Sequence, residues 1–238
     1  MAAEAHALHA SPVRSETELR RLLLIWQNPK TRMFVRVGEL SHLVDGRYSF
    51  RYLESVSRDH DFFALDEYPF IDKTYVSESL PAFFANRVMS SGRESYKEYI
   101  GWLGLDSTAA APPMEVLART GGGKATDTFH VVEVPGQGVN EQVWCRFFAS
   151  GVRHIPTARD VLDALAPGME LQLKGDEENR VNPHALLLTS DGQSVGWIPD
   201  WLVQDLAELA EGQVRVHVEK VNVDAPAHLR LLCAITKR

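Results

Sequence analysis

The chain has 238 residues, of which 45% are hydrophobic and 24% are charged, and its formal net charge at pH 7 is −7. This length suits one large domain or two small ones with their own cores. The acidic balance argues against broad electrostatic binding to duplex nucleic acid, because that mode needs many cations on the protein.

The cysteines and the start of the chain bear on the cellular compartment. Cys145 and Cys233 offer neither a disulfide framework nor a metal-ligand spacing, and we expect both to be buried thiols. No apolar stretch approaches the roughly 18 residues of a membrane span. Residues 1–18 lack the apolar region of a signal peptide and are expected to be a disordered tail. We therefore expect a cytoplasmic protein with no membrane contact, metal or cofactor.

The first half of the chain contains patterns typical of strands followed by short helices. Ser79 is expected to cap a helix that holds Pro81 in its first turn. The expected elements are strands at 22–27, 33–40 and 48–52, the helix after Ser79, a helix at 94–103, a helical turn at 114–117 and a strand at 129–134.

Two features of this half invite functional interpretations. Residues 120–124 read Thr-Gly-Gly-Gly-Lys, but a Walker A loop needs Gly and Ser/Thr where Ala118 and Ala125 stand, so we expect a hairpin connection. The aromatic pairs at 62–63 and 83–84 are expected in the core, with exposure at a partner surface as the alternative.

Taken in order, residues 21–135 resemble the N-terminal subdomain of HipA-type kinases, the persistence toxins of bacterial toxin–antitoxin systems. The matching segments are Val-Gly-Glu-Leu at 37–40, Tyr-Ser-Phe-Arg-Tyr at 48–52, Ser-Leu-Pro-Ala-Phe-Phe-Ala-Asn-Arg at 79–87, the helix near Arg93, and Pro-Met-Glu-Val-Leu at 113–117. The kinase core of that family is missing, so no catalytic residue carries over. In some members this subdomain is a separate protein that neutralises the kinase, which makes a HipA-type kinase a possible partner.

A turn-rich segment separates the two halves. Residues 135–140 read Pro-Gly-Gln-Gly-Val-Asn and lie between two β-branched or aromatic runs. We therefore expect a first domain at 19–135, a linker at 136–141 and a second domain at 142–238.

The second half is expected to begin with a strand at 143–148. Thr157 and Asp160 stand at capping-box spacing before a helix, and Asp191-Gly192 is a strong hairpin-turn signal. Further expected elements are strands at 169–173, 185–188 and 195–198 and a helix that follows Pro199.

The motifs of this half resemble the HIRAN domain. They are Gly-Val-Arg-His at 151–154, Asn-Arg-Val-Asn-Pro-His-Ala at 179–185 and Val-Gly-Trp-Ile-Pro at 195–199. The resemblance implies a small β-barrel related to the OB fold, here with two helices, so that the whole chain is of the α+β class. It also implies a pocket that grips the free 3′ end of single-stranded DNA.

The pocket residues carry over one by one, as implied by the resemblance. Arg153 would contact phosphate, and His154 stands where an aromatic stacks on a base. Asn179 would hold the backbone near the last nucleotide, and Asn182 replaces an Asp that accepts the 3′-hydroxyl. His184 replaces an Asn and Trp197 a His; Trp197 is either a substitute stacking platform or a core residue. Val181 and Asp200 replace a stacking Tyr and a Lys.

The sequence thus predicts a non-enzymatic regulatory protein that binds single-stranded DNA ends through its second half and a protein partner through its first. The alternative is an antitoxin-like inhibitor of a HipA-type kinase without DNA binding. No Gly-x-Ser-x-Gly motif or comparable catalytic pattern stands out. From Cys145 onward 10 Lys and Arg face 13 Asp and Glu, which favours a small end-selective pocket over extended backbone binding.

Overall fold

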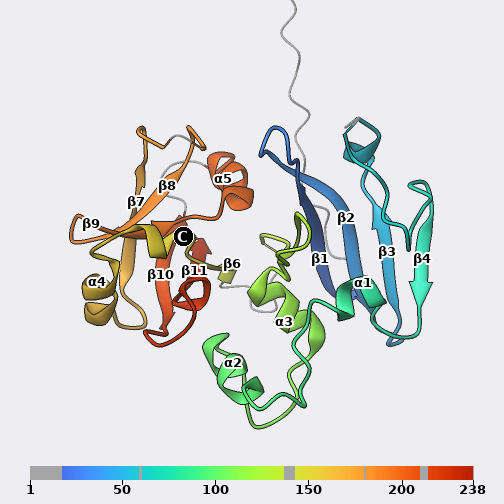
Figure 1. Cartoon of the computed structure of the whole chain (residues 1–238), viewed down its shortest axis with the longest axis horizontal. Coiled ribbons are helices and arrows are strands. Elements are labelled where there is room, and N and C mark those ends of the chain that lie inside the picture. The colour runs from blue at the N-terminus through green and yellow to red at the C-terminus, as the bar shows by residue number, and fades with distance from the viewer. Residues whose placement is uncertain (1–17, 59–60, 137–142, 180, 210–213, 238) are drawn as a thin grey trace, which may run out of the picture.

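The first half of the chain folds around a five-stranded antiparallel sheet in the computed structural model (Figure 1). The structure describes residues 18–58, 61–136, 143–179, 181–209 and 214–237. The strands are β1 (Glu18–Gln27), β2 (Phe34–Leu43), β3 (Tyr48–Tyr52), β4 (Thr74–Ser77) and β5 (Phe129–Glu133), in the order β4-β3-β2-β1-β5. The strands predicted at 22–27 and 33–40 are confirmed, and they pair as an antiparallel hairpin. Its turn is held by the carboxamide oxygen of Asn28, which accepts the backbone N–H groups of Lys30 at 2.9 Å and Thr31 at 3.2 Å.

Three short helices lie between β4 and β5 in the chain: α1 (Ala82–Ala85), α2 (Tyr96–Trp102) and α3 (Pro113–Thr120). The prediction of Ser79 as a helix cap is wrong, because Pro81 occupies the cap position with extended backbone angles. Proline disfavours helical backbone angles at the residue that precedes it, so Leu80 cannot be the first residue of a helix capped by Ser79. The helix at 94–103 is confirmed but begins later, after Ser95.

The core of the first half lies between its sheet and the segments that cover one face. Phe50 and Phe84 are fully buried there, with ring centroids 5.5 Å apart. Phe62 is also buried and packs edge-on against Trp26. The expectation that Phe63 is a core residue is wrong: its side chain is 81% exposed. Phe62 is the one that turns toward the ring of Trp26, and its neighbour is left at the surface.

The second half forms a six-stranded antiparallel sheet that closes on itself. Its strands are β6 (Val143–Phe148), β7 (Glu170–Gly175), β8 (Leu186–Ser190), β9 (Gln193–Trp197), β10 (Val214–Val221) and β11 (Leu231–Lys237), in the order β6-β11-β10-β7-β8-β9. A bridge between Ser150 and Trp197 joins the chain after β6 to β9. The β8–β9 turn is confirmed: Asp191 and Gly192 have φ of 48° and 78°, as a type I′ turn requires.

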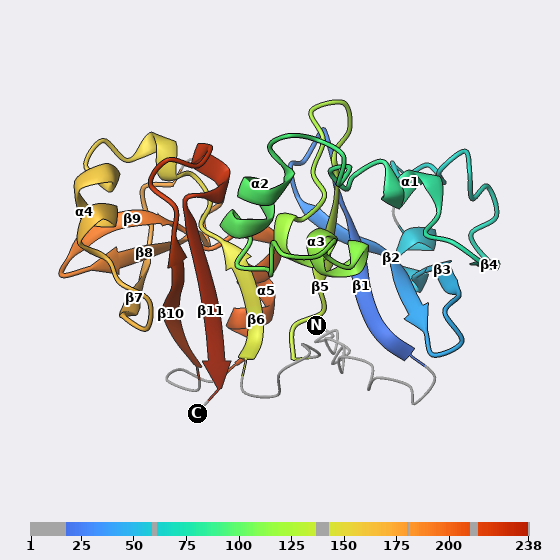
Figure 2. The ribbon, with the colours of Figure 1, turned by 90° about the horizontal axis from the view of Figure 1, so that it is seen from below.

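Two helices, α4 (Ala158–Ala164) and α5 (Asp200–Ala207), accompany this second sheet (Figure 2). Thr157 stands at the cap position of α4, but its side chain makes no capping hydrogen bond, so the predicted capping box is wrong. Its backbone adopts helical angles (φ −89°, ψ −2°) rather than the extended angles of a capping residue. No helix of the described residues has the length and hydropathy to span a membrane.

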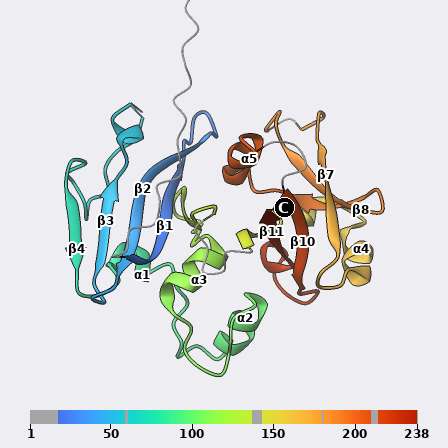
Figure 3. The ribbon, with the colours of Figure 1, turned by 180° about the vertical axis from the view of Figure 1, so that it is seen from behind.

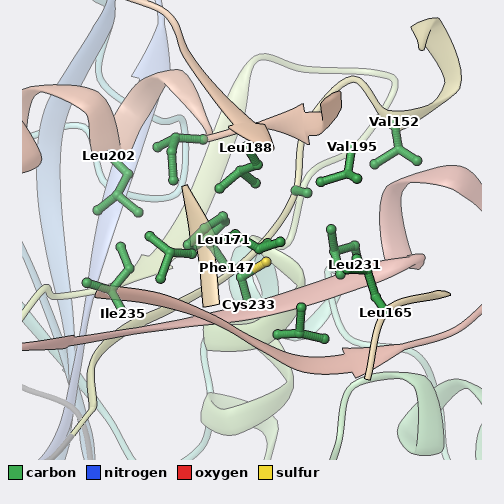
Figure 4. Packing of buried hydrophobic residues seen from close by; sticks show 14 of the residues in the cluster. Phe147, Val152, Leu165, Leu171, Leu188, Val195, Leu202, Leu231, Cys233 and Ile235 are labelled. Atoms are coloured by element: carbon green, nitrogen blue, oxygen red, sulfur yellow. The ribbon is translucent and has the colours of Figure 1, made fainter. Parts of the chain in front are cut away.

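The core of the second half is enclosed by its curved sheet and the two helices (Figure 4). Cys145 and Cys233 are confirmed as buried, free thiols, and they lie on the paired strands β6 and β11. Burial raises the pKa of both thiols, which keeps them protonated and unreactive at neutral pH.

The two sheets lie side by side, with α3 between them (Figures 1 and 3). A hydrophobic cluster joins Tyr96 and Ile100 of the first half to Ala225 and Leu229 of the second. Polar contacts extend this junction: Glu219 of β10 accepts Arg119 of α3 at 3.0 Å and Arg146 of β6 at 2.7 Å, and Arg36 of β2 pairs with Asp205 of α5. Each half has its own core, and the division into two independently stable domains stays a prediction. The expected tail and linker lie outside the described residues, except Glu18 and Gly136.

Candidate nucleic-acid interface

Trp197 is the centre of the group of residues that the sequence analysis selected. At the end of β9 its backbone exchanges hydrogen bonds with Ser150, of 2.8 and 2.9 Å. Its ring lies against Gly151: a Cβ on Gly151 would lie 2.5 Å from Cε3 of the indole. Gly151 also has φ of 67°, in the left-handed region that favours glycine. Glycine at 151 is therefore needed both for the turn and for the approach of the indole.

Arg153 and His154 follow directly in the 3₁₀ turn Val152–His154, and both are exposed. The Nε–H of Arg153 donates to Nε2 of His154 at 3.0 Å. This bond leaves the two terminal amino groups of the guanidinium without a partner among the described residues. They are the part of arginine that binds two phosphate oxygens at once.

The loop between β7 and β8 is held by Asn179. Its Oδ1 accepts the backbone N–H groups of Val181 and Asn182, both at 3.0 Å. Its Nδ2 donates to Oδ2 of Asp176 at 3.1 Å. Asn179 therefore shapes the loop from within, as asparagine often does in turns.

Asn182 continues the same network toward α5. Its Oδ1 accepts the backbone N–H of His184 at 2.9 Å, and its Nδ2 donates to Oδ1 of Asp200 at 2.8 Å. The amide oxygen that the resemblance assigns to a 3′-hydroxyl is thus already bonded within the loop. Asn182 lacks the carboxylate of the aspartate that it replaces in the resemblance. The carboxylate of Asp200 lies within hydrogen-bond distance of the Asn182 amide and can take over that role.

Two carboxylates, Asp176 and Asp200, belong to this hydrogen-bonded group. Oδ2 of Asp176 accepts the indole N–H at 2.8 Å, in addition to the bond from Asn179. Neither Asp176 nor Asp200 forms an ion pair with a described residue. Asp176 was not among the residues predicted from the sequence. A signal for it exists, because the indole N–H of a partly buried tryptophan needs a hydrogen-bond acceptor.

The structure thus places the predicted residues in two segments, the turn after Gly151 and the loop after Asp176, and each segment contacts the indole of Trp197. Hydrogen bonds connect Trp197 through Asp176 to Asn179, and Asn182 with the backbone of His184 belongs to the same loop. Arg153 and His154 join the group through the contact of Gly151 with the indole. His184 itself is exposed, and among the described residues only its backbone N–H, not its imidazole, is hydrogen-bonded to this group. Among the described residues, no three His, Cys, Asp or Glu side chains are grouped so as to hold a metal ion.

Two surface hollows lie elsewhere, in the first half of the chain. One, of about 420 Å³, is lined by Glu94, Ser95 and Glu98. The other, of about 380 Å³, lies beside Trp26. Neither includes a residue of the group around Trp197.

Comparison with known proteins adds little to this geometry. No family model matches the chain, and no curated protein matches it. Among solved structures, the crystal structure of the HIRAN domain of human HLTF is similar, with 17% identity, a TM-score of 0.31, and coverage of 39% of this chain and 72% of that chain. A likeness of this size establishes neither the fold nor the function of the second half. The resemblance of the first half to HipA-type kinases stays a prediction.

Proposed function

We propose that this chain is a non-enzymatic binding protein whose second half holds the free 3′ end of a single-stranded DNA at the surface around Trp197. The observation that carries the proposal is the exposed guanidinium of Arg153, two residues after the glycine on which the indole rests. Single-stranded nucleic acid binds where a cation and an aromatic face lie together, and Arg153 with its hydrogen-bonded neighbour His154 offers both.

Each group has a role in this proposal. Arg153 contacts a phosphate near the strand end, in a charge-assisted hydrogen bond about twice as strong as a neutral one. His154 and the accessible part of Trp197 offer faces for base stacking, which contributes roughly 1–3 kcal/mol per base. Asn179 and Asn182 keep the loop in shape rather than touching the strand through their amide oxygens.

The carboxylates favour a hydroxyl end over a phosphate end. Asp200 has one oxygen bound to Asn182, and its other oxygen has no partner among the described residues. A carboxylate accepts a hydrogen bond from a hydroxyl group, whereas an additional terminal phosphate beside Asp176 and Asp200 would be repelled. The proposal is therefore weak, end-selective binding in the cytoplasm, without membrane contact.

The test is fluorescence anisotropy with a short labelled strand that ends in a 3′-hydroxyl, at low salt, where electrostatic attraction is strongest. Arg153→Ala should weaken binding by about 1–3 kcal/mol. Arg159→Ala is the matched control, since Arg159 is an exposed arginine of α4 six residues later. Equal losses for both variants would indicate non-specific charge attraction and contradict a built site.

The same proposal includes a protein partner for the first half, a HipA-type kinase being the candidate that the resemblance implies. The exposed loop at 90–93 is the proposed contact surface. Co-purification from the native host followed by mass spectrometry tests it. Recovery of DNA-metabolism proteins alone, with no kinase of this type, would rule out the inhibitor function.

A further inference from the structure

A hydrophobic cluster joins the helix α2 to the second half of the chain. Tyr96 and Ile100 of α2 pack there with Leu229, which lies in the short turn Ala227–Leu229 between β10 and β11. We call this segment the hairpin turn. The three side chains are buried, with exposed fractions of 7% or less. Figure 2 shows α2 beside the hairpin turn. The position of α2 is therefore set in part by the second half.

The exposed loop at 90–93 is anchored at both ends on this cluster. Met89 precedes the loop and Tyr96 follows it, and both side chains pack into the cluster. Within the loop the backbone N–H of Arg93 donates to the carbonyl oxygen of Ser90 at 3.1 Å. The residues of the loop are themselves exposed. Because its two anchors lie on the cluster, the loop keeps its shape only while the cluster is packed.

Side chains of the second half also bind the last carbonyl groups of α2. The amide nitrogen of Asn222, just after β10, donates to the carbonyl oxygens of Trp102 and Leu229, both at 2.8 Å. Nζ of Lys220 donates to the carbonyl oxygen of Gly101. The last carbonyl groups of a helix have no partner within it, so these bonds cap α2 from the second half. A helix of 7 residues is far shorter than the roughly 12–15 residues at which isolated helices become marginally stable, so α2 depends on these contacts.

The turn that carries Arg153 lies against the same hairpin turn. Residues 152–154 form this turn, and they pack against residues 227–229. Phe148, the last residue of β6, packs against the cluster of α2, and the chain runs from it into the turn of Arg153. The surface around Arg153 and Trp197, here called the strand-end surface, and the cap of α2 therefore share one structural support.

We propose that a strand end bound at Arg153 stabilises α2 and the loop at 90–93, so that nucleic acid controls the order of the proposed protein-partner surface. This inference rests on the strand-end binding proposed above. A strand that holds Arg153 restricts its turn, and the hairpin turn that packs against it then opens less often. The cap of α2 opens with the hairpin turn, because Asn222 binds both. Ordering of one region can couple two sites in this way without a change of fold.

The test is hydrogen exchange of the full chain, with and without a short strand that ends in a 3′-hydroxyl. Mass spectrometry follows the peptides that cover 90–103, and anisotropy on the same sample shows whether the strand is bound. A saturating strand should slow the exchange of the α2 amides about fivefold or more, as coupling energies of ordinary size imply. The helix α1 is the internal control, because its Phe84 packs in the separate core of the first half, and its exchange should not change.

Two variants locate the route of the coupling. Asn222→Ala removes the amide that joins α2 to the hairpin turn and should abolish the slowing in α2 while the strand still binds. Lys220→Met keeps most of the apolar stem and should reduce the slowing, and it serves if Asn222→Ala proves unfolded in a thermal melt. Arg36→Ala is the matched control. It breaks the other polar contact between the halves, with Asp205, and should leave the slowing unchanged.

Each other result overturns the inference, and the results can be told apart. A strand that binds without slowing the exchange of α2 refutes the coupling and leaves the strand-end function standing. A strand that does not bind refutes both. Equal slowing in α1 and α2, or equal losses in Arg36→Ala and Asn222→Ala, would show general stabilisation of the fold instead of a route through the hairpin turn.

Discussion

The indole N–H of Trp197 donates a hydrogen bond to Oδ2 of Asp176 at 2.8 Å, across 21 residues of sequence. This bond ties the end of β9 to the loop that follows β7. Because the same indole rests on Gly151, it also ties that loop to the turn that carries Arg153. The geometry of the proposed strand-end surface therefore depends on one aromatic side chain and its two contacts.

Gly151→Ala should destabilise the second half by about 2–4 kcal/mol for two reasons. The new Cβ would clash with the indole of Trp197, and alanine would have to keep the left-handed φ of residue 151. Gly168→Ala isolates the second cause: Gly168 has φ of 89° with no atom within 4 Å of the added Cβ. Its cost should be near 1 kcal/mol. Urea denaturation measures both, and equal costs would show that the contact with Trp197 is unimportant.

Asp176→Ala should destabilise the fold by about 1–3 kcal/mol, because it leaves the indole N–H of Trp197 and Nδ2 of Asn179 without their acceptor. Glu177→Ala, at the exposed neighbouring position, should change stability by less than about 0.5 kcal/mol. Chemical denaturation compares the two. A neutral Asp176→Ala would mean that the indole finds its acceptor in water.

Stability should fall as the pH is lowered through the range below about 6.5, in part because of His130. Burial, with the nearby Arg87, lowers the pKa of the His130 imidazole in the folded chain. The unfolded chain then binds the proton more readily, so the stabilisation present above pH 6.5 is lost as the pH falls toward the folded-state pKa. Denaturation midpoints at several pH values measure this dependence. His130→Gln should reduce its slope, and an unchanged slope would contradict the assignment.

Limited proteolysis should cut the chain between residues 135 and 141 and leave a stable C-terminal fragment of about 95 residues. The reason is that each half has its own core. The contacts of Glu219 with Arg119 and of Arg36 with Asp205 would then be lost. If no such fragment survives, the two halves depend on their junction and form one folding unit.

Local signals in the sequence predicted part of this fold. The alternation at 48–52 and the Asp191-Gly192 turn have their causes within a few residues, and both are found as predicted. β4 was not predicted, because its four residues are ordered by pairing with β3 and carry little pattern of their own. β10 and β11 also did not enter the prediction, although they lie between β6 and β7 and connect them in the second sheet.

In the candidate site, too, features with local causes were predicted and features that depend on tertiary contacts were not. Arg153, His154 and Trp197 were selected from short motifs, and in the structure the turn that carries Arg153 and His154 begins at Gly151, which contacts the indole of Trp197. The bonds of Asn179 and Asn182 to their own loop could not be predicted, because they depend on where Asp176 and Asp200 lie in space. A local sequence motif does not show which distant residue tertiary folding will bring into hydrogen-bond distance.

The most direct test of the strand-end proposal compares one labelled strand in three forms: with a 3′-hydroxyl, with a 3′-phosphate, and closed into a circle. Anisotropy at low salt gives the three affinities. We predict that the hydroxyl end binds most tightly, that the phosphate end is weakened by repulsion from Asp176 and Asp200, and that the circle binds weakest. Asp200→Asn should narrow the gap between hydroxyl and phosphate. Equal affinities for all three forms, or no binding at all, would contradict the proposal and leave the second half as a protein-interaction domain.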